Sequence, residues 1–437
     1  MRPSKKLLDS TGIRSFCPKG PRRKPSFISR DEGQTSSHRR SAMRFVFATG
    51  IENSYPTIKH GTHRVDEMQK CGHYEHWSRD FDLVEEMGIL WLRYGPPLHT
   101  TWTGPVSYDW SFADETMADL KRRGIEPIVD LCHFGVPDFI GDFQNTDFPD
   151  LFYNYAFAFA QRFPWVRYYT PVNEMFVCAK FSGHYGWWNE QGTTDKTFVT
   201  ALINMVKANR LAMEAIRAVR PDAIFIQAES AEQFHAENVA AIEATEHRNQ
   251  QRFLSLDLNY GVDVSGTMYQ FLRDNGLSAE LYAWFMQGAD NRNCVVGTDY
   301  YYTNEHSVRA NGLTCGAGEV FGYAEIVRQY YDRYRLPIMH TETNLSDHAG
   351  GATRWLEKQF TNVLRLRQTG IPMLGFTWYS LTDQVDWNTA LREDNGFVCD
   401  LGLYDLDRKI RPVGKAYKAM IKEWAPHLIG HHLANVA

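Results

Sequence analysis

Two glutamates that each follow a strand-like run are the residues of this chain best suited to do chemistry. Glu174 ends the run that starts at Val166, and Glu342 lies near the end of the run that starts at Pro337. Cleavage of a glycosidic bond with retention of configuration needs one carboxylate as nucleophile and one carboxylic acid to protonate the leaving oxygen, about 5 to 5.5 Å apart. Two glutamates at strand ends can supply this pair, although a glutamate after a strand is also often solvated or paired with a base.

The two runs belong to a set of eight apolar segments, at 44–50, 89–95, 127–134, 166–174, 223–230, 294–302, 337–344 and 373–380. Nearly continuous apolar runs are typical of parallel strands buried on both faces. Helical patterns lie between them, at 78–88, 200–219, 360–368 and 415–424, with Ser78 as the expected N-cap of the first and Gly88 as its end. Eight alternations of strand and helix predict an α/β protein with a closed (β/α)8 TIM barrel, a single domain with elaborated loops.

Active sites of such barrels lie at the carboxyl ends of the strands, so the residues there are the functional candidates. They are Glu52 after the first strand, Arg93, His133, Asn173 with Glu174, Glu229, Asp299 with Tyr301, Glu342, and Trp378 with Tyr379 after the eighth. Converging acids, an arginine and aromatic rings suit a sugar, because flat rings pack on its apolar faces while polar groups bind its hydroxyls.

Composition narrows the class of protein. Hydrophobic residues make up 43% and charged residues 23% of the 437 residues, which allows a large core, and the aromatic content of 14% leaves rings to line a cleft. The seven cysteines are scattered without a Cys-x-x-Cys pair, which favours reduced thiols and a cytoplasmic location. No stretch approaches ~18 continuous apolar residues, so we expect no membrane span.

Charge is distributed unevenly along the chain. Residues 1–42 hold 11 of the 47 basic residues and 3 of the 52 acidic ones, so the remainder is strongly acidic. An acidic body argues against nucleic acid as a partner. We expect residues 1–42 to be a disordered basic extension, or the product of a start codon upstream of Met43, and residues 43–437 to form the barrel domain. A transit peptide agrees less well with the three acidic residues.

The strand-end segments resemble those of glycoside hydrolase family 1, the β-glucosidase family, in the same order from about 45 to 424. Thr170-Pro-Val-Asn-Glu is similar to the family's acid/base motif Thr-x-Asn-Glu-Pro, and His340-Thr-Glu-Thr-Asn to its nucleophile motif Thr-Glu-Asn-Gly. The other similar segments are 92–94, 124–134, 297–301, 378–387, 401–405 and 411–415. The resemblance implies a retaining β-glycosidase that acts on a small-molecule glycoside or oligosaccharide, and we expect neither a cofactor nor a metal.

The resemblance also implies a role for each candidate. Glu342 is the expected nucleophile, supported by Arg93, Tyr301 and Asn173, and Glu174 is the expected acid/base. The expected substrate-binding residues are His133, Phe134, Asp299, Trp378, Tyr379, Asp386 and Trp387. Trp378 and Tyr379 compete for one aromatic position, and Glu229 has no family role: it is either a buried structural acid or a third carboxylate facing an unusual substrate.

The chain departs from the family where the sugar is held. The family's early Gln aligns near residues 54–56, where no Gln stands, and Met175 replaces the Pro after the acid/base. Further departures are Phe134 for Trp, Asp299 for Asn and Asp386 for Glu. We therefore expect β-glycosidase chemistry on a substrate other than a plain β-glucoside, unless neighbours such as Glu52 or Gln144 restore the lost contacts.

Three other functions stay open at this point. A metal-dependent hydrolase could use Asp130, His133, Glu174 and His340, but the chain has no His-x-His or His-Glu-x-x-His spacing. A barrel that binds sugars without cleaving them is disfavoured because both glutamates are present. Transglycosylation shares the covalent intermediate of hydrolysis. The sequence determines neither the sugar nor the oligomeric state.

Overall fold

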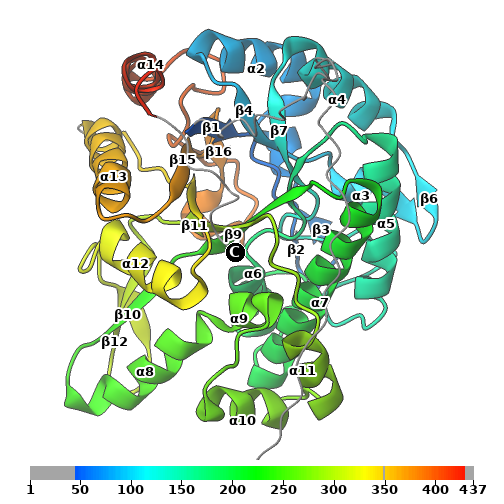
Figure 1. Ribbon diagram of the computed structural model, residues 1–437, viewed down its shortest axis with the longest axis vertical. Coiled ribbons are helices and arrows are strands. Elements are labelled where there is room, and N and C mark those ends of the chain that lie inside the picture. The colour runs from blue at the N-terminus through cyan, green and yellow to red at the C-terminus, as the bar shows by residue number, and fades with distance from the viewer. Residues whose placement is uncertain (1–44, 348–349, 429–437) are drawn as a thin grey trace, which may run out of the picture. The chain divides into compact units, whose positions relative to one another are not determined.

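The computed structural model describes residues 45–347 and 350–428, so the expected extension, residues 1–42, lies outside the described residues. Eight parallel strands close into a barrel in the order of the chain (Figure 1). They are β1 (Val46–Gly50), β4 (Trp91–Tyr94), β7 (Glu126–Asp130), β8 (Tyr168–Thr170), β9 (Ile224–Ser230), β11 (Cys294–Asp299), β14 (Ile338–Glu342) and β15 (Met373–Trp378). Each predicted run supplies one of these strands, which confirms the TIM barrel.

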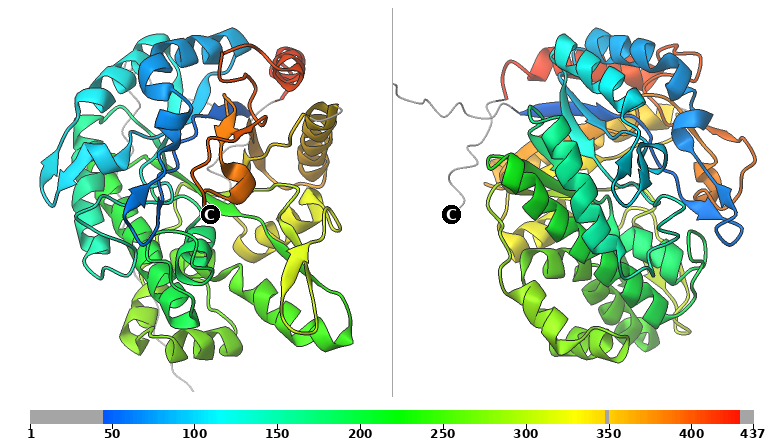
Figure 2. Two further views of the ribbon diagram at one scale, coloured as in Figure 1. Left: turned by 180° about the vertical axis from the view of Figure 1, so that it is seen from behind. Right: turned by 90° about the vertical axis from the view of Figure 1, so that its right-hand side faces the viewer.

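Helices surround the strands on the outside of the barrel (Figures 1 and 2). The main ones are α2 (His73–Met87), α4 (Ser111–Arg123), α5 (Phe148–Arg162), α7 (Asp195–Val219), α12 (Tyr323–Tyr334), α13 (Gly351–Gln368) and α14 (Pro412–Trp424). The four predicted helices are α2, α7, α13 and α14, and all begin earlier than expected. Ser78 is therefore not an N-cap but lies inside α2, whereas Gly88 does end that helix, with a φ of 75° that favours glycine.

The segments that follow the barrel strands carry additional short elements. They are β2 (Thr57–Ile58), β3 (His63–Arg64), α1 (Glu67–Lys70), α3 (Leu98–Thr101), β5 (Trp102–Gly104), β6 (Ser107–Tyr108), α6 (Met175–Gly183), β10 (Gln233–Ala236), α8 (Ile242–Gln251), α9 (Leu254–Tyr260), α10 (Gly266–Asp274), α11 (Ala279–Met286), β12 (Glu305–Val308), β13 (Thr314–Gly316), β16 (Gln384–Val385) and β17 (Val398–Cys399). Strands β10, β12 and β13 form a small sheet against α8. These elaborated segments build up the carboxyl-terminal face of the barrel.

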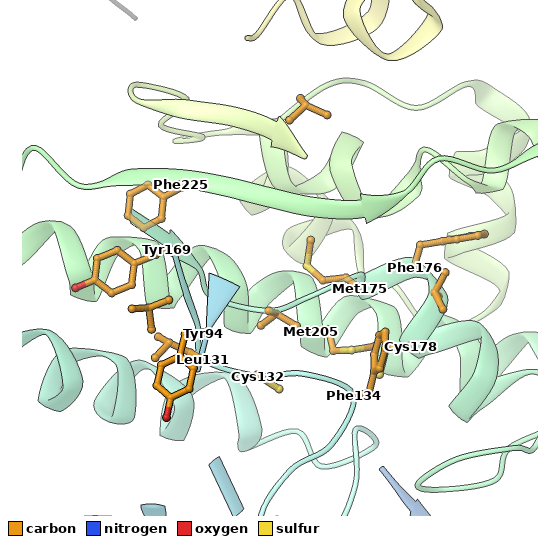
Figure 3. Close-up of a cluster of buried hydrophobic side chains, with 14 of the residues drawn as sticks. Tyr94, Leu131, Cys132, Phe134, Tyr169, Met175, Phe176, Cys178, Met205 and Phe225 are labelled. Carbon is orange, nitrogen blue, oxygen red and sulfur yellow. The ribbon is translucent and has the colours of Figure 1, made fainter. Parts of the chain in front are cut away.

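The apolar layer between strands and helices holds the start of α6 in place. Met175, Phe176 and Cys178 are buried there, and Figure 3 shows Met175 near Met205 of α7 and Cys178 near Phe134. Residue 175 directly follows Glu174, so this packing fixes the backbone that carries the predicted acid/base. None of the helices in the two described ranges combines the length and hydropathy needed to cross a bilayer.

Candidate active site

The two predicted catalytic glutamates lie close together at the carboxyl-terminal face. The amides of Asn173 and Glu174 donate to the carbonyls of Cys132 (2.9 Å) and Ala228 (3.1 Å), which pins the chain beyond β8 between its two neighbouring strands. Glu174 has a left-handed backbone, with a φ of 40°, where α6 begins. Glu342 is the last residue of β14. A carboxyl oxygen of Glu174 lies within 4.8 Å of one of Glu342.

The carboxylate of Glu342 has a donor on each oxygen. Arg93 donates to Oε1, and the Tyr301 hydroxyl donates to Oε2 at 2.6 Å. The group is 3% exposed, so little water screens these contacts. A guanidinium and a phenol hydroxyl thus hold the two carboxyl oxygens in a fixed orientation, as attack by a nucleophile requires.

Arg93 also connects this carboxylate to a buried polar network. Its Nη2 donates to Asp130 Oδ2 (2.9 Å) and to Asn173 Oδ1 (2.7 Å). His133 Nδ1 donates to the same Asp130 oxygen at 2.8 Å, and its Nε2 lies 3.1 Å from the Asn173 amide nitrogen. Burial lowers the pKa of His133, but the charge and hydrogen bond of Asp130 outweigh this effect and raise it.

Glu174 has the opposite electrostatic environment from Glu342. Burial raises the pKa of its carboxyl group well above the ordinary value, the charges of Asp299, Glu342 and Glu229 raise it further, and Arg93 offsets only part of the rise. A carboxyl group that keeps its proton near neutral pH can act as a general acid. The two glutamates are therefore suited to different steps of one reaction.

A cavity of about 1050 Å³ opens above the two glutamates. The residues that line it include Glu52, His133, Phe134, Glu174, Glu342, Tyr379, Gln384 and Trp387, and also Phe181, Tyr185, Trp187, Arg248, Tyr302 and Cys315. Rings and polar groups thus alternate around one space, as in sites that bind sugars. Four of the predicted substrate-binding residues, His133, Phe134, Tyr379 and Trp387, lie on this wall together.

Tyr379, and not Trp378, occupies the aromatic position at the cavity floor. The Tyr379 ring lies nearly parallel to the His133 ring, 6.3 Å away, and beneath the Arg93 guanidinium. Trp378 is fully buried and its Nε1 donates to the Leu401 carbonyl at 2.9 Å. Successive residues of a strand point to opposite faces, which is why only one of the two rings reaches the cavity.

The Asp386 side chain does not line the cavity. Its carboxylate instead accepts hydrogen bonds that hold the loop 395–397 in place. It accepts from Lys70 Nζ at 2.6 Å and from the amides of Asn395, Gly396 and Phe397 at 2.8 to 3.1 Å. Gln384, two residues earlier, does line the cavity and donates to Glu52 at 2.7 Å. Sequence reasoning missed Gln384, which carries no signal beyond its place after the eighth strand.

Glu229 is a buried structural acid, the first of its two expected alternatives. It accepts from Ser255 Oγ at 2.6 Å and from the amides of Phe176 and Ser230, and so ties the start of α6 to β9. Burial raises the pKa of its carboxyl group to about 7. Asp299, by contrast, has a carboxyl oxygen within 4.8 Å of oxygens of both Glu174 and Glu342.

The residue set of the metal-hydrolase alternative is not assembled. His340 is buried, its Nδ1 donates to the Thr298 carbonyl (3.1 Å), and its ring stacks on Tyr323; burial lowers its pKa to about 3. Within the described residues, the carboxyl groups of Glu174, Asp299 and Glu342 form the one cluster with metal-ligand spacing. This cluster contains neither Asp130 nor a histidine. Glu174 is the one residue that it shares with the set expected from the sequence.

Comparison with known proteins agrees with this geometry. The sequence model of "Glycosyl hydrolase family 1" matches residues 55–315. Beta-glucosidase A of Thermotoga maritima is 22% identical over 368 residues, 75% of this chain and 81% of that protein. The beta-glucosidase of Agrobacterium sp. is 23% identical over 392 residues, 80% and 84% of the two chains. The solved family 1 β-glucosidase of Thermotoga maritima has a TM-score of 0.73 at 17% identity and covers 86% of this chain and 97% of its own.

The family match spans more than half of the chain and includes the segment of Glu174, while Glu342 lies beyond it and is placed by the fold. The relatives are matched over most of their lengths, and the barrel is complete. The chain therefore belongs to glycosyl hydrolase family 1 and is a retaining β-glycosidase.

Proposed function

We propose that the protein hydrolyses small-molecule β-glycosides with Glu342 as nucleophile and Glu174 as acid/base. The separation of the two carboxyl groups supports this assignment most directly. Oxygens of the two groups lie within 4.8 Å of each other. Retaining enzymes hold the pair about 5–5.5 Å apart, whereas inverting enzymes leave about 6.5–9.5 Å for a water molecule.

In the first step, a Glu342 oxygen attacks the anomeric carbon while Glu174 gives its proton to the glycosidic oxygen. The bond to the aglycone breaks, the aglycone leaves as an alcohol, and Glu342 becomes a glycosyl ester. Tyr301 and Arg93 keep the attacking carboxylate oriented, because each binds one of its oxygens.

In the second step, Glu174 acts as a base. Esterification removes the negative charge of Glu342, which is one of the charges that raise the Glu174 pKa, so the deprotonated form becomes easier to hold. Glu174 takes a proton from water, whose oxygen attacks the anomeric carbon. The ester bond breaks, and both glutamates return to their starting states.

We propose that the sugar hydroxyls are bound by His133, Glu52 and Gln384, and that the substrate is not a plain β-glucoside. Glu52 is buried and accepts from the Ser54 amide (2.9 Å) and from Gln384, so its carboxylate is fixed in place at the cavity wall. Phe134 offers no hydrogen-bonding side chain, and Asp386 is used elsewhere. The names of the relatives also differ in the sugar that they specify. One relative is a 6-phospho-beta-glucosidase of Escherichia coli, which is 22% identical over 372 residues.

We further propose that the part of the cavity lined by aromatic rings receives the aglycone or a second sugar. Phe181, Tyr185 and Trp187 form a cluster of rings on this wall, and Arg248 lines the same cavity. The six cysteines in the described ranges are all free thiols, which supports the proposal of a reducing, cytoplasmic compartment. The barrel domain is proposed to begin near Met43.

A panel of aryl β-glycosides tests this function. Glucosides, galactosides, fucosides, xylosides and glucuronides are assayed for released phenol, and proton NMR follows the configuration of the first product. We expect hydrolysis with retention and a maximum at a sugar other than glucose. Absence of hydrolysis across the panel contradicts the proposed function, and a clear maximum for glucose contradicts the proposed sugar preference.

A further inference from the structure

One stretch of the cavity wall is built by the end of α6, by α8 and by the hairpin of β12 and β13. Phe181 lines the cavity from α6, Tyr185 from the segment after it, Arg248 from α8, and residues 312–316 from the hairpin. Helix α8 packs against the sheet that contains this hairpin, as Figure 1 shows. Arg248 Nη2 donates to the Gly312 carbonyl at 2.8 Å, which ties the helix to the hairpin.

Arg248 keeps N–H donors that the protein does not use. The Tyr185 hydroxyl lies beside its guanidinium, and Gly312 accepts one hydrogen bond from it. A guanidinium has more donors than these contacts occupy, and Arg248 is half-buried with no ion pair to a described carboxylate. Arg252, one turn later, is buried and donates to the carbonyls of Asn249 and Glu232 and to Gln329. Arg248 therefore differs in offering both charge and donors to the cavity.

A second cation lies behind the same wall. Lys180 of α6 is 5% exposed, and its Nζ donates to Gln251 Oε1 at 3.3 Å. The same nitrogen lies 4.6 Å from the centre of the Phe198 ring and 5.9 Å from that of Tyr185. Among the described residues, Lys180 forms no ion pair. Tyr185 is thus close to two cations, and neither cation has an acid as its partner.

The titration of the neighbouring groups agrees with an excess of positive charge. Burial and the charge of Arg248 lower the pKa of Lys180 to about 8. Burial and the charge of Lys180 lower the pKa of His184 to about 4, although Asp195 lies 3.4 Å away. Glu232 also lines the cavity, but its carboxylate lies 3.5 Å from His306 and is not paired with Arg248. A wall with this balance attracts an anion.

Aromatic rings adjoin the two cations on the same wall. The centres of the Phe181 and Tyr185 rings lie 4.6 Å and 5.1 Å from that of Trp187. Rings of this kind pack against a planar aromatic group. Because Tyr185 belongs to the ring cluster and its hydroxyl adjoins Arg248, an aromatic group on these rings has the guanidinium at its edge.

We propose that this wall binds an aromatic aglycone that carries a carboxylate, with the Arg248 guanidinium and the Tyr185 hydroxyl as donors to the carboxylate. The planar guanidinium fork matches the two oxygens of a carboxylate. The proposal rests on the proposed function, because it assigns the sugar to the two glutamates and the leaving group to this wall. It adds the class of aglycone, an aromatic acid.

Binding of paired ligands, measured by calorimetry, tests the proposal without turnover. Each pair consists of two aryl 1-thio-β-glycosides of the preferred sugar, which resist cleavage, with a para carboxylate in one and the corresponding amide in the other. Pairs with no, one or two methylene groups before the substituent allow for differences in reach. We expect one carboxylate to bind about tenfold more tightly than its amide, as for a charge-assisted hydrogen bond, and the ratio to fall with added salt. A ratio near one in all pairs overturns the proposal.

Substitution of Arg248 locates the charge that is read. Arg248→Met keeps an apolar stem and should reduce the ratio to within about twofold of one, whereas Arg248→Lys should keep part of it. Arg392→Met is the matched control. Arg392 lines the same cavity but is exposed, and its guanidinium lies 4.5 Å from the centre of the Trp187 ring. The control should keep the wild-type ratio, and loss of the ratio in Arg392→Met but not in Arg248→Met overturns the assignment.

Glu232→Gln provides a test of opposite sign that leaves Arg248 in place, even if the Arg248 variants do not fold. Removal of this negative charge should raise the ratio of carboxylate to amide affinity, because the carboxylate is then repelled less. A lowered ratio contradicts an electrostatic role for the wall. If no thioglycoside binds, with the neutral amides included, the proposed function fails. If the amides bind and the carboxylates bind no better, only the aglycone proposal fails.

Discussion

Tyr301 and Tyr300 are neighbouring tyrosines that each donate a hydrogen bond to a glutamate, so they form a matched pair of substitutions. Tyr301 donates to Glu342 at 2.6 Å, at the site, and Tyr300 donates to Glu305 at 2.9 Å, away from it. Substitution by phenylalanine removes only the hydroxyl in each case. Tyr301→Phe thus isolates one of the two hydrogen bonds that orient the proposed nucleophile.

The expected size of the effect follows from the kind of bond that is lost. A hydrogen bond to a charged group contributes about 1.5–3 kcal/mol. If this bond orients the attacking carboxylate in the transition state, its loss should lower kcat/KM by roughly 10- to 150-fold, at ~1.4 kcal/mol per factor of ten. Arg93 remains on the other oxygen, so activity should not vanish.

The assay measures kcat/KM for an aryl β-glycoside of the preferred sugar together with the thermal midpoint of each variant. Tyr300→Phe should lower the midpoint while leaving kcat/KM within about threefold of the wild type. If Tyr301→Phe also stays within threefold, or if Tyr300→Phe loses as much activity as Tyr301→Phe, then the contact with Glu342 does not support catalysis.

Three further predictions follow from the same geometry. Glu174→Ala should slow glycosides with poor leaving groups by ~10²- to 10⁴-fold and activated aryl glycosides far less, since general acid help matters least for a stable leaving group; equal losses across a leaving-group series contradict the acid/base role. The pKa of Glu229 in the folded state is raised to about 7. At a pH between the ordinary pKa of a glutamate and 7, the folded state therefore binds more protons than the unfolded state. As the pH rises from about 4.5 to 7, the free energy of unfolding should therefore fall by about 3 kcal/mol because of this group. Glu229→Gln should flatten this pH dependence, and an unflattened curve counts against the raised pKa. A chain that starts at Met43 should keep the activity and thermal midpoint of the full chain, because the site residues all lie in the described barrel. A large drop in activity or in the midpoint would show that the proposed domain boundary is wrong.

The barrel could be predicted because its strands are buried on both faces, so each strand corresponds to an apolar run in the sequence. The helix starts were harder to predict, because a first turn such as residues 195–197 is polar and carries no apolar period. Helix α7, for example, begins at Asp195 behind the capping side chain of Thr194, five residues before the pattern that predicted it. Local capping, rather than periodicity, determines where this helix begins.

The location of the two glutamates at the carboxyl-terminal face was also predictable, since strand ends are where a barrel places its active site. The groups around them depend on features that only the folded backbone shows. The register between β11 and β14 skips Thr341 and so pairs Asp299 with Glu342, and the hydrogen bonds of loop 395–397 take Asp386 away from the cavity. The choice of Tyr379 over Trp378 likewise depends on the direction in which each ring points at the end of β15.

The central claim is that Glu342 forms the covalent bond to the sugar. The most direct measurement replaces Glu342 by glycine and follows turnover of an activated aryl glycoside with added azide, with NMR of the glycosyl azide product. The variant alone should be inactive, and azide, entering the space left by the carboxylate, should restore turnover and give a product of inverted configuration. A rescued product of retained configuration contradicts the account, because that outcome identifies the substituted residue as the acid/base and not as the nucleophile.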